Sequence, residues 1–196
     1  MAKLPSEEEL DALDASLQPY FIALGKVAHA WNHLHEELGK VFCSITGLDL
    51  SVGMNIWHSI KSDRSQREML AGAITAVASD EDWVAVRPQA VVGVRWLLKK
   101  IDKIASKRNS AIHAPCFPTL GPDHFEIKPL TFFSNRLALR LAGKDILKEF
   151  SLYEEAADTL RQHTKVVRYA IDAKTAWPDR PPLPDFGPDD LPGTAK

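Results

Sequence analysis

Apolar residues recur at the spacing of an α-helix through most of this sequence, and this pattern restricts the fold more than any other feature. After Pro19 the apolar positions follow the i, i+3, i+4, i+7 rule until Gly47. The same spacing recurs before Val77 and again from Val91 to His113. Because each segment has one apolar face, it must bury that face against another segment. The sequence therefore predicts a mainly α-helical bundle.

Capping residues give the expected helix boundaries. Ser6 and Glu9 form a capping box, so a short first helix is expected from there to about Leu17, separate from the longer helix that follows. Only a short turn is expected within residues 47–61, and the last helix is expected to end near Trp177. The later helices are expected to begin at these caps: Asp63, Asp80, and Ser151 paired with Glu154.

The helical pattern is lost between Pro115 and Gly143. This stretch contains four prolines, a turn signal at residues 121–123 and alternating side chains at residues 137–141. Because the residue before a proline is pushed out of helical geometry, Pro115 should end the preceding helix. We expect a small β-hairpin or meander inserted near residues 115–143.

Length and charge set the expected domain organisation. A chain of 196 residues suits one domain with appendages, so we predict a single helical-bundle domain over residues 1–177, with its core at 19–176. Residues 178–196 contain six prolines and carry a net charge of −2, which equals the net charge of the whole chain. Because proline has no N–H to donate, we expect this tail to be disordered or loosely draped.

Several classes of protein do not fit the sequence. The two cysteines, Cys43 and Cys116, lack the spacing of a metal site or a disulfide scaffold. No stretch has the roughly 20 apolar residues of a membrane span, and the acidic N-terminus lacks the apolar core of a signal peptide. Phosphate-binding and nucleophile-elbow glycine motifs are also missing. We expect a cytoplasmic protein with no membrane partner, no cofactor and no metal.

Arg108 interrupts the apolar face of its helix. Val94, Ile101 and Arg108 are seven residues apart and share one face, so the arginine occupies a core position. Burying an uncompensated guanidinium costs roughly several kcal/mol, and a purely structural helix would favour leucine or isoleucine there. Asn109 and His113 are four residues apart and point away from Arg108, towards a cleft or solvent.

The run Arg108-Asn109-Ser110-Ala111-Ile112-His113 resembles the R-x4–6-H motif of the HEPN superfamily. The resemblance covers residues 19–176 and implies a small helical bundle that forms a homodimer, in which two copies of the motif make one composite active site. Many HEPN proteins are metal-independent endoribonucleases that act as toxins, defence proteins or RNA-processing factors. Other members have lost catalysis and serve as binding modules.

The resemblance implies that Arg108, Asn109 and His113 are the catalytic residues. Attack of the RNA 2′-hydroxyl on its own phosphate needs proton transfer and positive charge, which His113 and Arg108 would supply. Asn109 would orient His113 or bind a phosphate oxygen. Residues 95–113 contain six basic residues and one acidic residue, a net charge of +5. We expect RNA-backbone contacts from four of them: Arg95, Lys99, Lys103 and Lys107.

A non-catalytic alternative uses the same residues. In that case Arg108 braces the helix end against a carboxylate, with Glu36 and Glu37 as open candidates, and His113 bonds the terminal carbonyls. The protein is then an interaction module, for instance an antitoxin-like or regulatory subunit, in which the same residues hold the dimer together. Under either interpretation, an antitoxin or a regulatory protein is a candidate partner.

Two further polar groups have structural interpretations. His29, His33 and Glu37 recur at metal-ligand spacing, but both histidines fall opposite the apolar face, and a metal site is not expected. The other group lies at the start of the third helix, where we expect capping and surface pairing: Asp63, Arg64 and Arg67.

Overall fold

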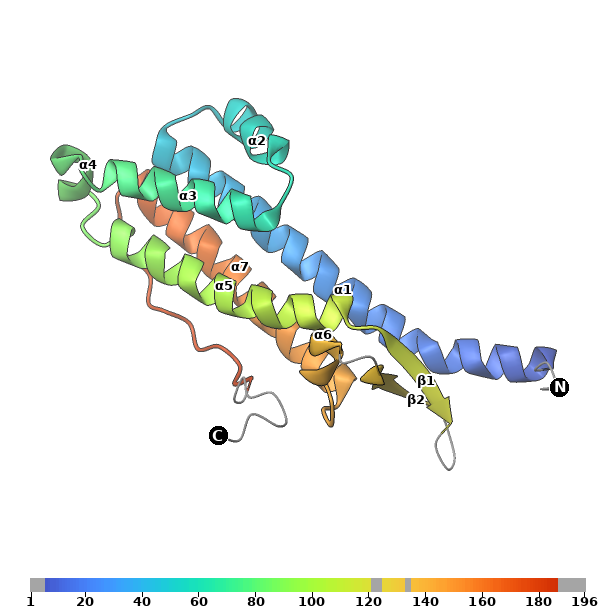
Figure 1. Cartoon of the computed structure of the whole chain (residues 1–196). Helices are drawn as coiled ribbons and strands as arrows, with labels where there is room; N and C mark the ends of the chain where they lie inside the picture. The colour runs from blue at the N-terminus through green and yellow to red at the C-terminus, as the bar shows by residue number, and fades with distance from the viewer. Residues whose placement is uncertain (1–5, 121–124, 133–134, 187–196) are drawn as a thin grey trace. The chain divides into compact units, whose positions relative to one another are not determined.

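The computed structural model describes residues 6–120, 125–132 and 135–186, and this part of the chain is mainly helical (Figure 1). The helices are α1 (Glu7–Thr46), α2 (Leu50–Ser59), α3 (Asp63–Val77), α4 (Glu81–Ala85), α5 (Ala90–His113), α6 (Arg136–Leu139) and α7 (Ile146–Ala173). The strands are β1 (Cys116–Leu120) and β2 (Phe125–Pro129). The prediction of a mainly helical protein with a small β-hairpin is confirmed.

Residue contacts divide the chain into two compact units. Unit 1 comprises Met1–Ala28, Ala105–Glu154 and Asp185–Lys196, and unit 2 comprises His29–Ile104 and Glu155–Pro184. Helices α1, α5 and α7 each contribute residues to both units. The two units are therefore not separate stretches of the chain, and the single domain over residues 1–177 stays a prediction.

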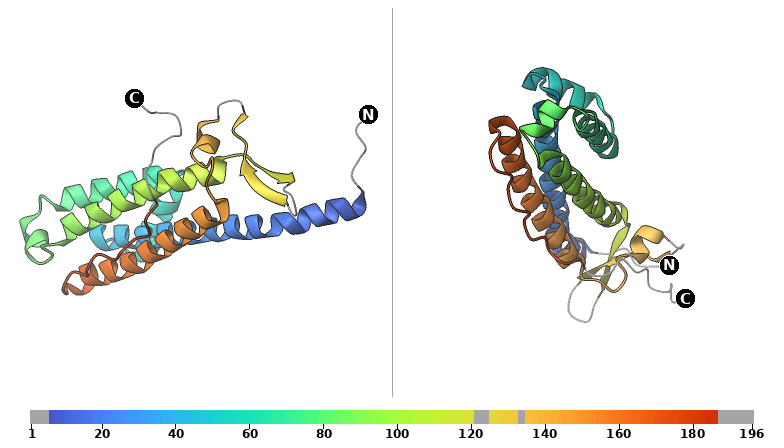
Figure 2. Two further views of the ribbon diagram at one scale, coloured as in Figure 1. Left: turned by 90° about the horizontal axis from the view of Figure 1, so that it is seen from below. Right: turned by 90° about the vertical axis from the view of Figure 1, so that its left-hand side faces the viewer.

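Unit 2 is a layer of helical segments from α1, α3, α5 and α7 that lie side by side, as both views in Figure 2 show. Their apolar faces meet in one core, as the helical spacing of the sequence predicts. The core side chains include Leu34, Leu38, Val41, Leu70, Ile74, Val94, Leu97, Ile101, Leu160 and Val167, all buried. Helix α2 adds Trp57, which is fully buried against Phe42 of α1.

Unit 1 has its own core, built by the first part of α1, the end of α5, the hairpin and the start of α7. Its buried members are Val27, Ala111, Ile146, Phe150 and Tyr153. The two strands are antiparallel, with Cys116 opposite Pro129 and Pro118 opposite Ile127. Cys116 and Ile127 pack against this core, which fixes the hairpin beside the end of α5. The predicted turn at residues 121–123 falls largely outside the described residues.

Helix α1 differs from the prediction of two helices separated at Pro19. It is continuous over 40 residues with Pro19 inside it. A proline lacks the N–H that would bond the carbonyl four residues earlier, so only the bond to Ala15 is lost on this account. The apolar residues of the next turns, Tyr20, Leu24 and Val27, pack in the core of unit 1, which favours continuation of the helix.

Two predicted boundaries around α2 and α3 are also wrong. The stretch 47–61 holds the ten-residue helix α2 (Leu50–Ser59) rather than a short turn, because Trp57 is buried and Asp49 caps the helix. The cap of α3 is Ser62, whose hydroxyl accepts a hydrogen bond from the Ser65 N–H at 3.1 Å. Asp63 instead accepts a bond from the Trp31 indole N–H at 2.6 Å. The predicted cap of α4, Asp80, is confirmed.

The last two helices correct the sequence-based boundaries further. Residues 136–139 form α6, capped by Asn135, where alternating side chains predicted a strand. Helix α7 begins at Ile146, five residues before the predicted cap Ser151, because Ile146 and Phe150 are both buried one turn apart. The Asp145 carboxylate accepts a bond from the Lys148 N–H at 3.0 Å and serves as the cap.

The described part of the predicted disordered tail packs against the helices. Residues 178–186 form neither helix nor strand. In unit 2 the Arg180 guanidinium lies 5.3 Å from the Trp96 ring centroid, and in unit 1 the Phe186 ring stacks on Tyr153 at 5.6 Å. Residues 178–186 thus lie against the helices without regular secondary structure, as the loosely draped alternative describes. Residues 187–196 lie outside the described residues.

Candidate functional site

The motif residues lie in unit 1 at the end of α5. Asn109 and His113 are exposed, and Arg108 is half-buried. The Arg108 Nη1 donates a hydrogen bond to the Asn109 Oδ1 at 3.0 Å. Because residues four apart lie on the same face of a helix, Asn109 and His113 present an amide and an imidazole on one exposed face. The structure therefore brings an arginine, an asparagine and a histidine to one exposed helix end.

Arg108 shares the helix face of Val94 and Ile101, as expected, but it is only half-buried. The buried positions of α5 include Leu97, Ile101, Ile104, Lys107 and Ala111. At this end of α5 the buried surface thus extends to Lys107, which lies about 100° from Arg108 around the helix. Arg108 is consequently able to reach the exposed side chain of its neighbour.

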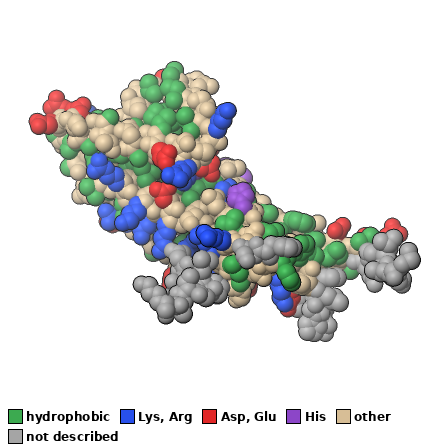
Figure 3. Space-filling view, viewed as in Figure 1, with side chains coloured by type: hydrophobic (Ala, Val, Ile, Leu, Met, Phe, Trp, Pro, Cys, Tyr) green, Lys and Arg blue, Asp and Glu red, His purple; other side chains and the backbone are tan. Residues whose placement is uncertain are grey.

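The burial of Lys107 corrects its assignment to an exposed basic face. Lys107 is only 8% exposed, and its ammonium lies 5.6 Å from the Phe186 ring centroid. The other three residues of the predicted basic face, Arg95, Lys99 and Lys103, are exposed on α5 in unit 2. Lysine and arginine side chains gather over this part of α5 in Figure 3. The surface that could bind RNA phosphates therefore includes three of the four predicted residues.

A second arginine reaches the motif turn from a distant part of the chain. The Arg140 Nη1 donates a hydrogen bond to the hydroxyl of Ser110 at 3.2 Å, and Ser110 is buried. The Ser110 hydroxyl also donates to the Ser106 carbonyl at 3.1 Å. The contact brings a second guanidinium to the turn that carries Arg108 and Asn109. No sequence signal predicted it, because the two residues are 30 positions apart.

Two titratable groups near the end of α5 remain protonated near neutral pH. Burial, with a smaller contribution from Cys116, raises the pKa of Tyr20 to about 12. Burial also raises the pKa of the Cys116 thiol, although its hydrogen bond with Tyr20 lowers it in part. Neither group is therefore a ready base or nucleophile.

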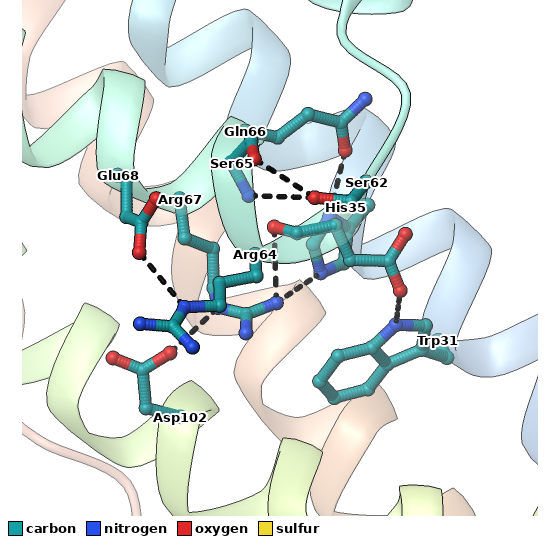
Figure 4. Close-up of polar contacts among 10 residues, drawn as sticks. Trp31, His35, Ser62, Arg64, Ser65, Gln66, Arg67, Glu68 and Asp102 are labelled. Carbon is teal, nitrogen blue, oxygen red and sulfur yellow. Dashed lines mark hydrogen bonds and ion pairs between the residues drawn. The ribbon is translucent and has the colours of Figure 1, made fainter.

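The polar cluster at the start of α3 in unit 2 is not the surface pairing that we expected. Arg67 is only 7% exposed, and its Nε donates to the Asp102 Oδ1 of α5 at 2.7 Å (Figure 4). Its Nη1 donates to the Asp63 carbonyl at 3.1 Å and lies 3.3 Å from the His35 Nε2. Arg64 does behave as predicted, because its pair with Glu68 is exposed.

The bonds around His35 define its tautomer. An arginine can only donate, so the His35 Nε2 must accept from Arg67. The His35 Nδ1 then carries the proton and donates to the Gln66 Oε1 at 3.1 Å. His35 is buried against the Trp31 ring, with centroids 5.0 Å apart. These bonds join α1, α3 and α5 of unit 2, and we interpret the cluster as structural.

The side chains with metal-ligand spacing have other contacts. The His29 and His33 rings lie 4.2 Å apart, while the Glu37 carboxylate pairs with Lys40 at 2.8 Å. Glu36 lies 3.5 Å from the His58 Nε2. Among the described residues, no three His, Cys, Asp or Glu side chains converge as a metal site. No helix in the described ranges is both long enough and apolar enough to cross a bilayer.

Known proteins add no assignment to this geometry. Comparisons of the chain with protein-family models, with curated proteins and with solved structures found no match.

Proposed function

We propose that this protein is a metal-independent endoribonuclease of the HEPN type, in which Arg108, Asn109 and His113 act on RNA at a composite site between two copies. The observation that carries the proposal is the bond from Arg108 to Asn109 beside an exposed His113 on the last turns of α5. Such an enzyme would serve as a toxin, a defence protein or an RNA-processing factor.

The bond to Asn109 supports a catalytic role for Arg108. A half-buried guanidinium held at 3.0 Å by an exposed amide is fixed in direction at the protein surface. A fixed positive charge stabilises a crowded phosphate better than a freely moving one, because no reorganisation is needed during the reaction. Arg140, bonded to Ser110 on the same turn, adds positive charge to this surface.

Proton transfer would fall to His113. In each active site one imidazole takes the proton of the attacking 2′-hydroxyl, and a second protonates the leaving 5′-oxygen. A single copy carries one such histidine in the motif, so the reaction calls for two copies of the motif. The exposed residues Arg95, Lys99 and Lys103 would bind RNA phosphates.

The test is cleavage of single-stranded RNA by the purified chain in the presence of EDTA. We expect His113→Ala to lower the cleavage rate by about 10²–10⁴-fold, the usual contribution of a general acid or base. Because His113 is exposed, the variant should unfold at the same urea concentration as the parent. His33→Ala, which removes an exposed histidine of α1, is the matched control and should cleave normally.

A mixing experiment tests the composite site. Refolding the parent with an excess of His113→Ala should lower its activity far below that of the parent refolded alone, because hybrid pairs contain only one of the two imidazoles. Equal cleavage by His113→Ala and the parent would refute the catalytic assignment. Unchanged parent activity in the mixture would refute the composite site.

The non-catalytic interaction module has one observation in its favour. On α1 in unit 1, three large apolar side chains are about half exposed: Leu10, Phe21 and Ile22. Exposed apolar groups on one helix mark a protein-binding surface. If binding were the function, Phe21→Glu with Ile22→Glu would abolish association in sedimentation experiments, and neither the parent nor any motif variant would cleave RNA.

A further inference from the structure

The C-terminal segment Trp177–Pro184, which we call the strap, is anchored on α5 in unit 2. It forms neither helix nor strand. A Cβ on Gly93 of α5 would lie 2.1 Å from the Trp177 Cζ2, so the indole occupies space that only a glycine leaves free. Trp177 therefore fixes the strap at one defined position on the helix.

Three residues after its anchor, the strap places a cation over a tryptophan of α5. The Arg180 guanidinium carbon lies 5.3 Å from the Trp96 ring centroid, and the Lys100 ammonium lies 6.0 Å from the same centroid. Trp96 is half-buried and Arg180 is exposed. One indole thus meets two cations from different parts of unit 2.

Further cations lie on the same helix. Arg95, Lys99 and Lys103 are exposed on α5. The acidic residue among them, Asp102, pairs with Arg67 of α3 at 2.7 Å. An aromatic ring set among cations is the composition of sites that bind single-stranded nucleic acid, where the ring stacks on a base and the cations follow the phosphates.

We propose that Trp96 is a stacking platform for a base of single-stranded RNA, and that Arg180 moves outward to hold the base against the indole. Lys99, Lys100 and Lys103 then contact the flanking phosphates. The inference takes from the proposed function only that RNA is the ligand, and it does not require cleavage.

The present distance shows that Arg180 must move. Stacked rings lie about 3.4 Å apart, so a base between indole and guanidinium needs a separation of about 6.8 Å. The Arg180 guanidinium carbon lies only 5.3 Å from the ring centroid, so Arg180 must move outward to admit a base. Its side chain is exposed and its strap has no helical bonds to break, while the Trp177 anchor keeps it near the ring.

His163 of α7 sets the position of the Trp96 ring. The imidazole meets the indole edge-on, with centroids 5.4 Å apart, and His163 is only 6% exposed. Its Nε2 has no hydrogen-bond partner among the described residues. Burial and the charge of Arg180 lower the pKa of His163, so the imidazole is neutral at pH 7 and adds no charge to the cationic group.

Fluorescence anisotropy with two labelled 12-nucleotide RNAs tests the inference. One probe is oligouridylate, and the other has the same phosphates with abasic positions in its centre. All proteins carry His113→Ala so that cleavage does not interfere. We expect Trp96→Ala to weaken binding of oligouridylate about 10-fold or more and to leave the abasic probe unchanged. Trp96→Phe should keep most of the affinity.

Trp83→Ala is the matched control, because Trp83 is also half-buried in unit 2 with an arginine, Arg87, 5.0 Å from its ring. It should bind both probes like the parent. An equal loss on both probes, or no loss on either, would overturn the stacking role of Trp96, and so would a lack of RNA binding by the parent. The chain that keeps His113 is tested for RNA cleavage in parallel. If Trp96→Ala weakens binding of oligouridylate only, and the chain with His113 does not cleave RNA, this inference is sustained and the proposed function is refuted.

Discussion

Arg67→Met replaces the buried guanidinium of the α3 cluster by an apolar side chain of similar length. The change removes the 2.7 Å pair with Asp102 and the donor to the His35 Nε2. Methionine should fill most of the space against Trp31, because it is unbranched and adaptable. The substitution therefore removes the hydrogen bonds and the ion pair of Arg67 while keeping most of its packing against Trp31.

The expected cost follows from what is left behind. The Nε2 of buried His35 loses its donor, and an unsatisfied buried acceptor costs about 1–3 kcal/mol. Asp102 is 61% exposed and regains water, so its lost pair adds little. Relief of the buried charge offsets part of the cost. We expect a loss of about 2 kcal/mol in the free energy of unfolding, or about 4–8 °C in Tm.

The assay is urea unfolding followed by circular dichroism at pH 7.5. Arg64→Met is the matched control on the same helix, since the Arg64 pair with Glu68 has nearly the same length, 2.8 Å, but both side chains are exposed. We expect the control to unfold at the same urea concentration as the parent. The double variant Arg67→Met with His35→Phe should lose less than the sum of its parts, because the orphaned acceptor is removed with its donor.

Equal effects of Arg67→Met and Arg64→Met would refute the argument, because burial is the main difference between the two pairs. Strict additivity in the double variant would refute the role assigned to the His35 Nε2. It would also remove the basis for the tautomer in which the His35 Nδ1 carries the proton.

Two further predictions concern the strap and its surroundings. Gly93→Ala should expel Trp177 from α5 and shift part of the tryptophan fluorescence emission to longer wavelength, without lowering the urea midpoint, because alanine favours the helix by about 1 kcal/mol; an unchanged emission spectrum would show that the strap is held elsewhere. The pKa of His163 is lowered in the folded chain. Below about pH 6.5 the unfolded chain therefore binds a proton that the folded chain does not. The contribution of His163 to the free energy of unfolding is present above that pH and is lost as the pH falls. His163→Phe should remove this pH dependence. Between pH 7.5 and 5 the free energy of unfolding of the variant, measured relative to that of the parent, should rise by at most about 1.4 kcal/mol per pH unit. If the free energies of unfolding of variant and parent change in parallel with pH, the lowered pKa of His163 is contradicted.

The sequence predicted a helix boundary correctly where one residue alone determines it. Pro115 ends α5 as expected, and β1 and β2 form the small hairpin expected after it. Where two adjacent residues compete, the sequence alone could not decide. Ser62 and Asp63 are both good caps, and the contact that engages Asp63, the Trp31 indole, comes from 32 residues earlier.

The same limit applies to the candidate site. From Ile101 a heptad count reaches Arg108, whereas the 3–4 spacing from Ile104 reaches Lys107, and both lie within the width of an apolar face. In the structure Lys107 is buried, whereas Arg108 is half-buried and bonds the exposed Asn109. Asn109 and His113 were less ambiguous, because their polar side chains fall on the exposed face under either count.

The basic character of α5 is likewise a result of tertiary contacts as much as of composition. The count of +5 over residues 95–113 includes Lys107, which is buried, and subtracts Asp102, which Arg67 of another helix engages. The strap contributes Arg180 beside Trp96. Several cations of unit 2 therefore lie around one aromatic ring. A single-stranded nucleic acid, which has both phosphates and planar bases, therefore fits this surface better than an anion without an aromatic group does.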